Sequence, residues 1–137
     1  EYRSTKALKD EEERKQLYLQ FASIAEKYLP LQRDTDKNFI AIIAKSPLDL
    51  INEGEILHHC VGRMNYDQRF IREESLIFFI RDKNSPDTPL VTVEYSLKQH
   101  IVLQCYGDND SKPNEQILNF VHRKWLPYAN KKLKQIA

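Results

Sequence analysis

The chain has little glycine, cysteine and methionine, and it lacks any long apolar run. Its 137 residues include three glycines, two cysteines and one methionine. Two cysteines do not make the disulfide scaffold of a small secreted protein, so a reducing cytoplasm is the expected location. No apolar run approaches membrane length and no signal peptide is recognisable, so we expect no membrane partner. A glycine-rich phosphate loop and the GxSxG and HExxH motifs are also absent, which removes the familiar nucleotide and hydrolase signatures.

Charge of either sign is not in excess. The 21 Lys and Arg residues nearly balance the 20 Asp and Glu residues, so the formal net charge is +1. Such a chain has no global field that would imply a polyanionic partner, and any nucleic-acid argument must rest on local clusters. The composition, 41% hydrophobic and 30% charged, is typical of one folded domain. Because the chain starts at Glu1 without a methionine, we expect a fragment of a longer protein.

Hydrophobic periodicity predicts an α+β fold, in which a small, mainly antiparallel sheet of three to four strands lies between N-terminal and C-terminal helices. We expect residues 1–35 to form an amphipathic helix and a connector, and residues 36–137 to form a single globular unit. The predicted elements are a helix over 8–29 ended by Pro30, a strand over 39–44, a helix capped by Ser46 and stopped at Gly54, a short helix within 64–75, strands over 76–81, 90–96 and 100–107, and a final helix opened by Pro113 and ended or kinked by Pro127.

Two of the predicted strands share a polar face. Residues 76–80 are apolar throughout, which suits a central strand covered on both faces. If the next two strands form a hairpin, matching their apolar sides places Val93 opposite Leu103. The same register places Thr92 opposite Gln104, with Glu94 diagonal to Gln104. This polar face is either a solvated side of the sheet or a partly closed site in which a carboxylate acts as a functional acid or base.

The segment LHHC at residues 57–60 places two histidines before a cysteine. Adjacent side chains point in different directions, so His58 and His59 are not expected to serve one site. The chain offers no CxxC or HxxxH pair that could supply the remaining ligands, which disfavours structural zinc. We assign no metal and no cofactor. Cys60 is either a nucleophile assisted by a histidine or a core residue. Cys105 alternates with apolar residues and is predicted to lie in the core, and a disulfide between the two cysteines is disfavoured.

The C-terminal segment is basic, with no acidic residue after Glu115. Its cations either complement the dipole of the final helix or form a phosphate-contacting face, which arginines near the middle of the chain would extend. The candidate nucleic-acid-binding residues are Arg63, Arg69, Arg72, Arg123, Lys124, Lys131, Lys132 and Lys134.

Several motifs follow one another in a specific order: EGxxLxHCVG at residues 53–62, a tyrosine at position 66, a strand ending in arginine, PxxTxE at residues 89–94, and a glutamine, glycine and asparagine element. Over about residues 50 to 126 this order resembles the PcfJ-like proteins of conjugative plasmids, integrative elements and phages. The matching residues are Glu53, Gly54, Leu57, His59, Cys60, Val61, Gly62, Tyr66, Arg81, Pro89, Thr92, Glu94, Gln104, Gly107 and Asn109. The resemblance implies a mobile-element setting, and it names no reaction.

Three hypotheses of function follow. The first is a nucleic-acid-associated module that binds DNA or RNA, and other proteins of the element, during transfer or processing of mobile DNA. The second is an enzyme, either a Cys/His/Glu hydrolase or a nucleotide-using transferase. The third is a protein-interaction domain in which the polar residues brace the fold. The candidate catalytic residues of the second hypothesis are His59, Cys60, Tyr66, Arg81, Glu94, Gln104 and Asn109.

Overall fold

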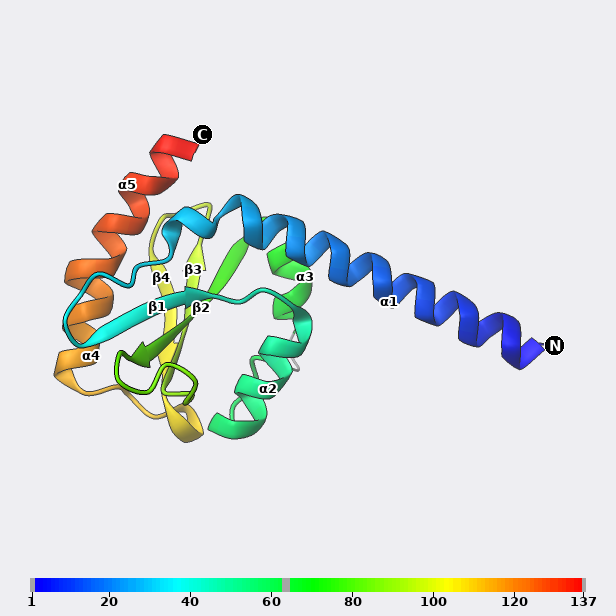
Figure 1. Ribbon diagram of the computed structural model, residues 1–137, viewed down its shortest axis with the longest axis horizontal. Coiled ribbons are helices and arrows are strands. Elements are labelled where there is room, and N and C mark those ends of the chain that lie inside the picture. Colours follow the sequence, from blue (N-terminus) through cyan, green and yellow to red (C-terminus); the bar gives the residue numbers. More distant parts are fainter. Residues whose placement is uncertain (1, 63–64, 137) are drawn as a thin grey trace.

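The structure is a computed structural model that describes residues 2–62 and 65–136. Its centre is a four-stranded antiparallel sheet with the strands in sequence order, as Figure 1 shows. The strands are β1 (Phe39–Ile43), β2 (Ser75–Asp82), β3 (Val91–Ser96) and β4 (Val102–Tyr106). The sheet and its helices confirm the predicted α+β class. The expectation of a covered central strand is also confirmed, because β2 lies between β1 and β3 and only its last residue is exposed.

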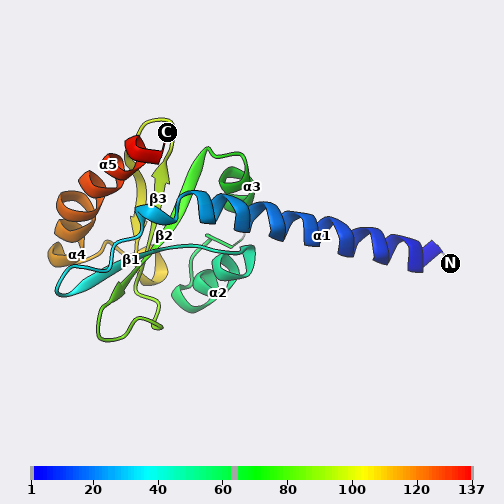
Figure 2. The ribbon, with the colours of Figure 1, turned by 45° about the horizontal axis from the view of Figure 1, so that its top comes forward.

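Helices cover both faces of the sheet. The helical segments are α1 (Tyr2–Lys27), η1 (Leu29–Leu31), α2 (Pro47–Leu57), α3 (Tyr66–Ile71), η2 (Asp108–Asp110), α4 (Glu115–Asn119), the π-helical η3 (Phe120–Trp125) and α5 (Leu126–Ile136). In Figures 1 and 2, α4 and α5 lie against one face, and α2 and α3 lie against the other. No helix within residues 2–62 and 65–136 is both long enough and apolar enough to span a bilayer.

The face under the C-terminal helices is an aromatic core. The ring of Trp125 lies 4.6 Å from that of Phe78 and 5.6 Å from that of Tyr95. Its indole N–H also donates a 2.8 Å hydrogen bond to the carbonyl of Leu31, so this large buried side chain keeps no unpaired polar group. The apolar stripe predicted for the final helix is confirmed by its buried members, which are Ile117, Phe120, Val121 and Trp125.

Helix α1 packs against α3, on the side of the sheet away from α4 and α5. Its C-terminal half packs on α3, where the rings of Phe21 and Phe70 stack at 3.8 Å. The N-terminal half of α1 extends away from the body, and residues 5–16 are exposed (Figure 1). The helix ends at Lys27, and Pro30 lies in the short turn that follows, close to the predicted end. The proposed division at residue 35 remains a prediction.

Helix α2 begins as predicted but ends later. Ser46 caps it, because its hydroxyl accepts the backbone N–H of Asp49, and Pro47 opens the first turn. The predicted stop at Gly54 is wrong, because the helix continues to Leu57 and the left-handed residue that ends it is His58. Gly54 has a different role: a Cβ there would lie 2.9 Å from the carbonyl of His59, so the glycine lets the chain after α2 fold back against the helix.

The final helical segment differs from its prediction at its start, and of the two alternatives predicted for Pro127 the structure rules out an end of the helix. Asn114, rather than Pro113, forms the N-cap, because its side chain accepts the N–H of Ile117. Pro127 does not end the helix, which continues as α5 to Ile136. The proline lies in the first turn of α5, directly after the π-helical η3, where the regular helical hydrogen bonds are already altered.

The pairing of β3 with β4 also differs from its prediction. Neither the predicted pair of Val93 and Leu103 nor that of Thr92 and Gln104 is present. Gln104 lies directly opposite Glu94, and the register shifts after that pair. The unpaired residue of the resulting bulge is Leu103, whose side chain is 46% exposed. The bulge therefore brings the two polar groups of the hairpin closer together than apolar matching predicted.

Candidate functional site

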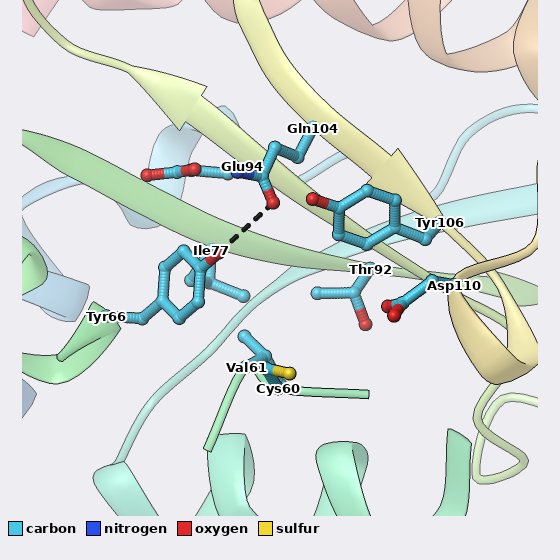
Figure 3. Close-up of a pocket in the computed structure, with 9 residues that line it drawn as sticks. All are labelled: Cys60, Val61, Tyr66, Ile77, Thr92, Glu94, Gln104, Tyr106 and Asp110. Carbon is cyan, nitrogen blue, oxygen red and sulfur yellow. Dashed lines mark hydrogen bonds between the residues drawn. The ribbon is translucent and has the colours of Figure 1, made fainter. Parts of the chain in front are cut away.

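The polar face of β3 and β4 forms one wall of a half-open cavity. The opposite walls come from α3 and from the segment that follows α2, and together they enclose a cavity of about 360 Å³. Figure 3 shows side chains from these separate elements arranged around it. The lining residues are Cys60, Val61, Tyr66, Ile77, Thr92, Glu94, Gln104, Tyr106 and Asp110. The predicted polar face is thus partly covered, because Thr92 and Glu94 are buried whereas Cys60 and Asp110 at the rim are exposed.

Glu94 is the buried carboxylate of this cavity, with 3% of its surface exposed. Its Oε2 accepts hydrogen bonds from the hydroxyl of Ser75 at 2.7 Å and from the guanidinium of Arg69 at 3.1 Å. Its Oε1 is buried and has no donor among the residues that the structure describes. Because an unsatisfied buried acceptor costs about 1–3 kcal/mol, this oxygen is the most unusual polar atom of the site.

Tyr66 and Gln104 form the wall next to Glu94. The Tyr66 hydroxyl donates a 3.1 Å hydrogen bond to the Gln104 side-chain oxygen, which Figure 3 shows as a dashed line. The guanidinium of Arg69 lies 4.9 Å from the centre of the Tyr66 ring, so Arg69 contacts both the ring and the carboxylate. Burial raises the pKa of Tyr66 and the negative charge of Glu94 raises it further, so the hydroxyl stays protonated and can donate.

Tyr106 lies across the cavity from Tyr66 (Figure 3). Burial raises the pKa of Tyr106, and the neighbouring Tyr66, Asp110 and Glu94 raise it further. Its hydroxyl therefore also stays protonated at neutral pH. The cavity thus combines neutral hydroxyl donors with carboxylate acceptors.

Both ring nitrogens of His59 contact neighbouring groups of the cavity wall. Its Nε2 lies 2.9 Å from the Thr92 hydroxyl, and its Nδ1 accepts the backbone N–H of Val61 at 3.4 Å. Both ring nitrogens are therefore occupied, and the tautomer with a proton on Nε2 fits these contacts. The interpretation of Cys60 as a core residue is wrong, because Cys60 is exposed at the cavity. The sequence signal misled because Cys60 lies in an irregular segment after α2, where flanking apolar residues do not define a face.

Cys105 is partly buried against the core, as predicted. It lies opposite Val93, on the face of the sheet away from the cavity. Both cysteines are free thiols.

Arg81 and Glu53 lie outside the cavity and bind each other. Two guanidinium nitrogens of Arg81 donate to the two carboxylate oxygens of Glu53 at 2.6 and 2.5 Å, and both residues are buried. The guanidinium also lies 5.1 Å from the ring of Phe79. This bidentate pair attaches α2 to β2, so the structure separates Arg81 from the other candidate catalytic residues.

The loop after β4 brings further polar groups to the rim. Asn109 and Asp110 both have left-handed backbone angles, with φ of 54° and 59°. Asp110 lines the cavity, whereas the Asn109 amide bonds to the carboxylate of Asp108 at 3.2 Å. His58 contacts the same Asp108 at 2.9 Å and so joins the two rim segments. Asn109 is thus a neighbour of the cavity rather than part of its lining.

The candidate nucleic-acid-binding residues do not form one continuous face. Arg69 lies in the wall beside Glu94, and Arg72 bonds to Glu74 at 3.5 Å. Arg63 lies outside the described residues. The C-terminal cations belong to η3 and α5, which cover the opposite side of the sheet (Figure 1). The predicted extension of the basic helix by the central arginines is therefore absent among the described residues.

Sequence reasoning missed three members of the site: Ser75, Tyr106 and Asp110. Strand alternation places Tyr106 on the same side as Gln104, and this was the available signal. No pattern marked Ser75 or Asp110, because their roles depend on the strand register and on the turn after β4. Within residues 2–62 and 65–136, no group of three or more His, Cys, Asp and Glu side chains is arranged to hold a metal ion.

Comparisons with known proteins support the family resemblance that the order of the motifs indicated. Residues 3–121 match the family described as PcfJ-like protein. The chain is also 34% identical over 110 residues to the uncharacterized protein Lin1253/Lin1744 of Listeria innocua. This alignment covers 80% of the chain but 23% of that protein, so the chain corresponds to a small part of its relative. No solved structure matches the chain. From the family match, which spans most of the chain, we conclude that the chain belongs to the PcfJ-like protein family.

Proposed function

We propose that the chain binds a small polar ligand in the cavity between β3, β4 and α3, and that Glu94 receives a hydrogen bond or a proton from it. The observation that carries this proposal is the buried Oε1 of Glu94, which has no donor among the described residues. The cavity of about 360 Å³ suits a small ligand, since ligand sites commonly measure about 300–1,000 Å³.

The arrangement around Glu94 suits a general base as well as a binding group. Ser75 and Arg69 donate to Oε2 and so hold the carboxylate in place, while Oε1 has no donor among the described residues and could accept from a substrate. Tyr66 and Gln104 hold each other at 3.1 Å beside it and can orient a bound molecule. Candidate substrates are therefore compounds with an O–H or N–H group that can donate a hydrogen bond or a proton to Glu94.

A Cys/His hydrolase is the less favoured enzyme reading. A nucleophilic cysteine needs an adjacent base, but the two ring nitrogens of His59 contact Thr92 and the backbone of Val61. Cys60 instead contributes an exposed thiol to the lining. We therefore place the reactive role on Glu94 and a supporting role on His59.

Ligand screening by NMR with ¹⁵N-labelled protein tests this proposal. We expect some small polar metabolites of a mixed library to shift the amide signals of Gln104 and Tyr106, and Glu94→Gln to abolish those shifts. Glu55→Gln is the matched control, because Glu55 is exposed on α2. Tyr106→Phe, which removes a single hydroxyl, provides a milder variant if Glu94→Gln unfolds. Ligands that bind Glu94→Gln and Tyr106→Phe as well as the unmodified chain would contradict the proposal.

A second candidate function is the binding of DNA or RNA through the C-terminal helix, in a role in the transfer or processing of mobile DNA in the cytoplasm. It is favoured by the cations Arg123, Lys124, Lys131, Lys132 and Lys134, none of which has an ion-pair partner among the described residues. On this reading other proteins of the mobile element are further partners. Filter binding at ~50 mM salt tests it, with affinity falling steeply as salt rises and falling further in Lys131→Ala with Lys134→Ala. Absence of binding at ~50 mM salt would exclude this role.

A further inference from the structure

The lining of the cavity carries negative charge without a matching positive group. Glu94 and Asp110 are its carboxylates, and none of its described lining residues is Lys, Arg or His. Arg69 contacts Oε2 and so balances Glu94, whereas Asp110 has no ion-pair partner among the described residues. A phosphate or other anion placed here would meet an excess of negative charge. The charge of the lining therefore selects against anionic ligands.

The buried Oε1 of Glu94 limits the chemical class of the ligand further. A hydroxyl group would satisfy Glu94 Oε1 but would leave the charge of Asp110 unmatched. A guanidinium or ammonium group carries several N–H donors together with a positive charge. It can therefore donate to Oε1 and attract Asp110 at the same time, which a neutral ligand does not do.

The chain already contains a cation held in this manner. Arg69 donates to Glu94 Oε2 at 3.1 Å and lies 4.9 Å from the centre of the Tyr66 ring. On the far side of the cavity the Tyr106 ring has no cation over it among the described residues. The cavity thus offers the same kinds of group a second time, a carboxylate oxygen without a donor in Glu94 Oε1 and an aromatic ring without a cation in Tyr106, both among the described residues.

This inference rests on the proposed ligand site. We infer that the ligand is cationic, a guanidinium or primary-amine compound whose positive group lies between Glu94 Oε1 and Asp110 and against Tyr106. Two sources share this chemistry, a free small molecule and an arginine or lysine side chain of another protein.

Titration with a matched pair of probes tests the inference. Butylguanidinium and butylurea have nearly the same shape, but only the first is charged. We expect butylguanidinium to shift the amide signals of Gln104 and Tyr106, and butylurea and inorganic phosphate to leave them unchanged. Asp110→Asn should weaken butylguanidinium binding about two- to fivefold, as expected for a partly exposed charge pair. Asp34→Asn, at an exposed position away from the cavity, is the control and should leave binding unchanged. A parallel titration with acetyl-Gly-Arg-Gly-amide distinguishes the sources, because tighter binding of the peptide indicates a protein side chain and tighter binding of butylguanidinium indicates a small molecule.

The outcomes separate this inference from the proposal beneath it. Butylurea binding as tightly as butylguanidinium, or an unchanged affinity in Asp110→Asn, would overturn the cationic assignment. Neutral ligands from the library that need Glu94 but not Asp110 would overturn it too, while leaving the proposed site intact. If no library compound and neither probe needs Glu94, the proposed function itself fails.

Discussion

Removal of the Glu53 carboxylate should destabilise the fold strongly, because it leaves the Arg81 guanidinium buried without a partner. Arg81 is 8% exposed and Glu53 is 2% exposed, and two hydrogen bonds of 2.6 and 2.5 Å join them. Breaking a buried pair from one side costs about 3–5 kcal/mol, whereas replacing both partners by apolar residues costs much less. Set against a typical domain stability of about 5–15 kcal/mol, Glu53→Leu alone should remove a large share of the free energy of unfolding.

Urea denaturation followed by the fluorescence of Trp125 measures this effect, since Trp125 is the only tryptophan and is fully buried. We expect Glu53→Leu to lower the midpoint sharply, and the double variant with Arg81→Met to recover most of the loss. Glu55→Gln on the exposed side of α2 should change little. A loss below about 1 kcal/mol in Glu53→Leu, or a double variant no more stable than the single one, would refute the reasoning. Retained ligand binding in the double variant would also place Arg81 outside the catalytic machinery.

Three further predictions concern other parts of the fold. Burial raises the pKa of Tyr95 to about 12, so the contribution of Tyr95 to stability should be complete below pH 10 and be lost between pH 10 and 12, where its hydroxyl ionises only in the unfolded state; pH-dependent urea midpoints check this, and a Tyr95→Phe variant should lose that component of the decline. Iodoacetamide should modify the exposed Cys60 well before Cys105, whose pKa burial raises to about 11, and peptide mass spectrometry that found equal rates would contradict this order. Phe70→Ala should cost about 3–5 kcal/mol and speed amide exchange in the part of α1 around Phe21, because it removes the ring stacked at 3.8 Å; unchanged exchange there would show that α1 is held by other contacts.

Periodicity and capping signals predicted most of the elements, because those signals are local. The strand at residues 76–81, the Ser46 cap and the apolar stripe through Trp125 all depend on neighbours within a few positions. The errors arose where a distant segment changed the local preference. Gly54 lies inside α2 because the chain after the helix packs against it, and the strand register shifts at Leu103 because of a bulge that alternation does not reveal.

The candidate site was predictable in part. Motif order grouped Glu94, Gln104, Tyr66 and the His59 and Cys60 pair, and the structure brings these residues to one cavity and its wall. The same motif order also included Arg81, which the structure places in a separate ion pair with Glu53. Spacing along the chain does not distinguish a residue that faces a cavity from one that holds two elements together, because both kinds can occur in the same motif.

By itself the sequence determined the class of fold, the polar face of the hairpin and the chain's resemblance to its family, because each of these depends on residue type and spacing. Only the tertiary structure decided which polar groups meet. Packing against α3 left one oxygen of Glu94 without a donor among the described residues and brought Arg69 to that carboxylate, and the turn after β4 brought Asp110 to the cavity. The physical reason is that hydrogen-bond satisfaction and charge balance depend on contacts between segments far apart in the chain, which no local pattern encodes.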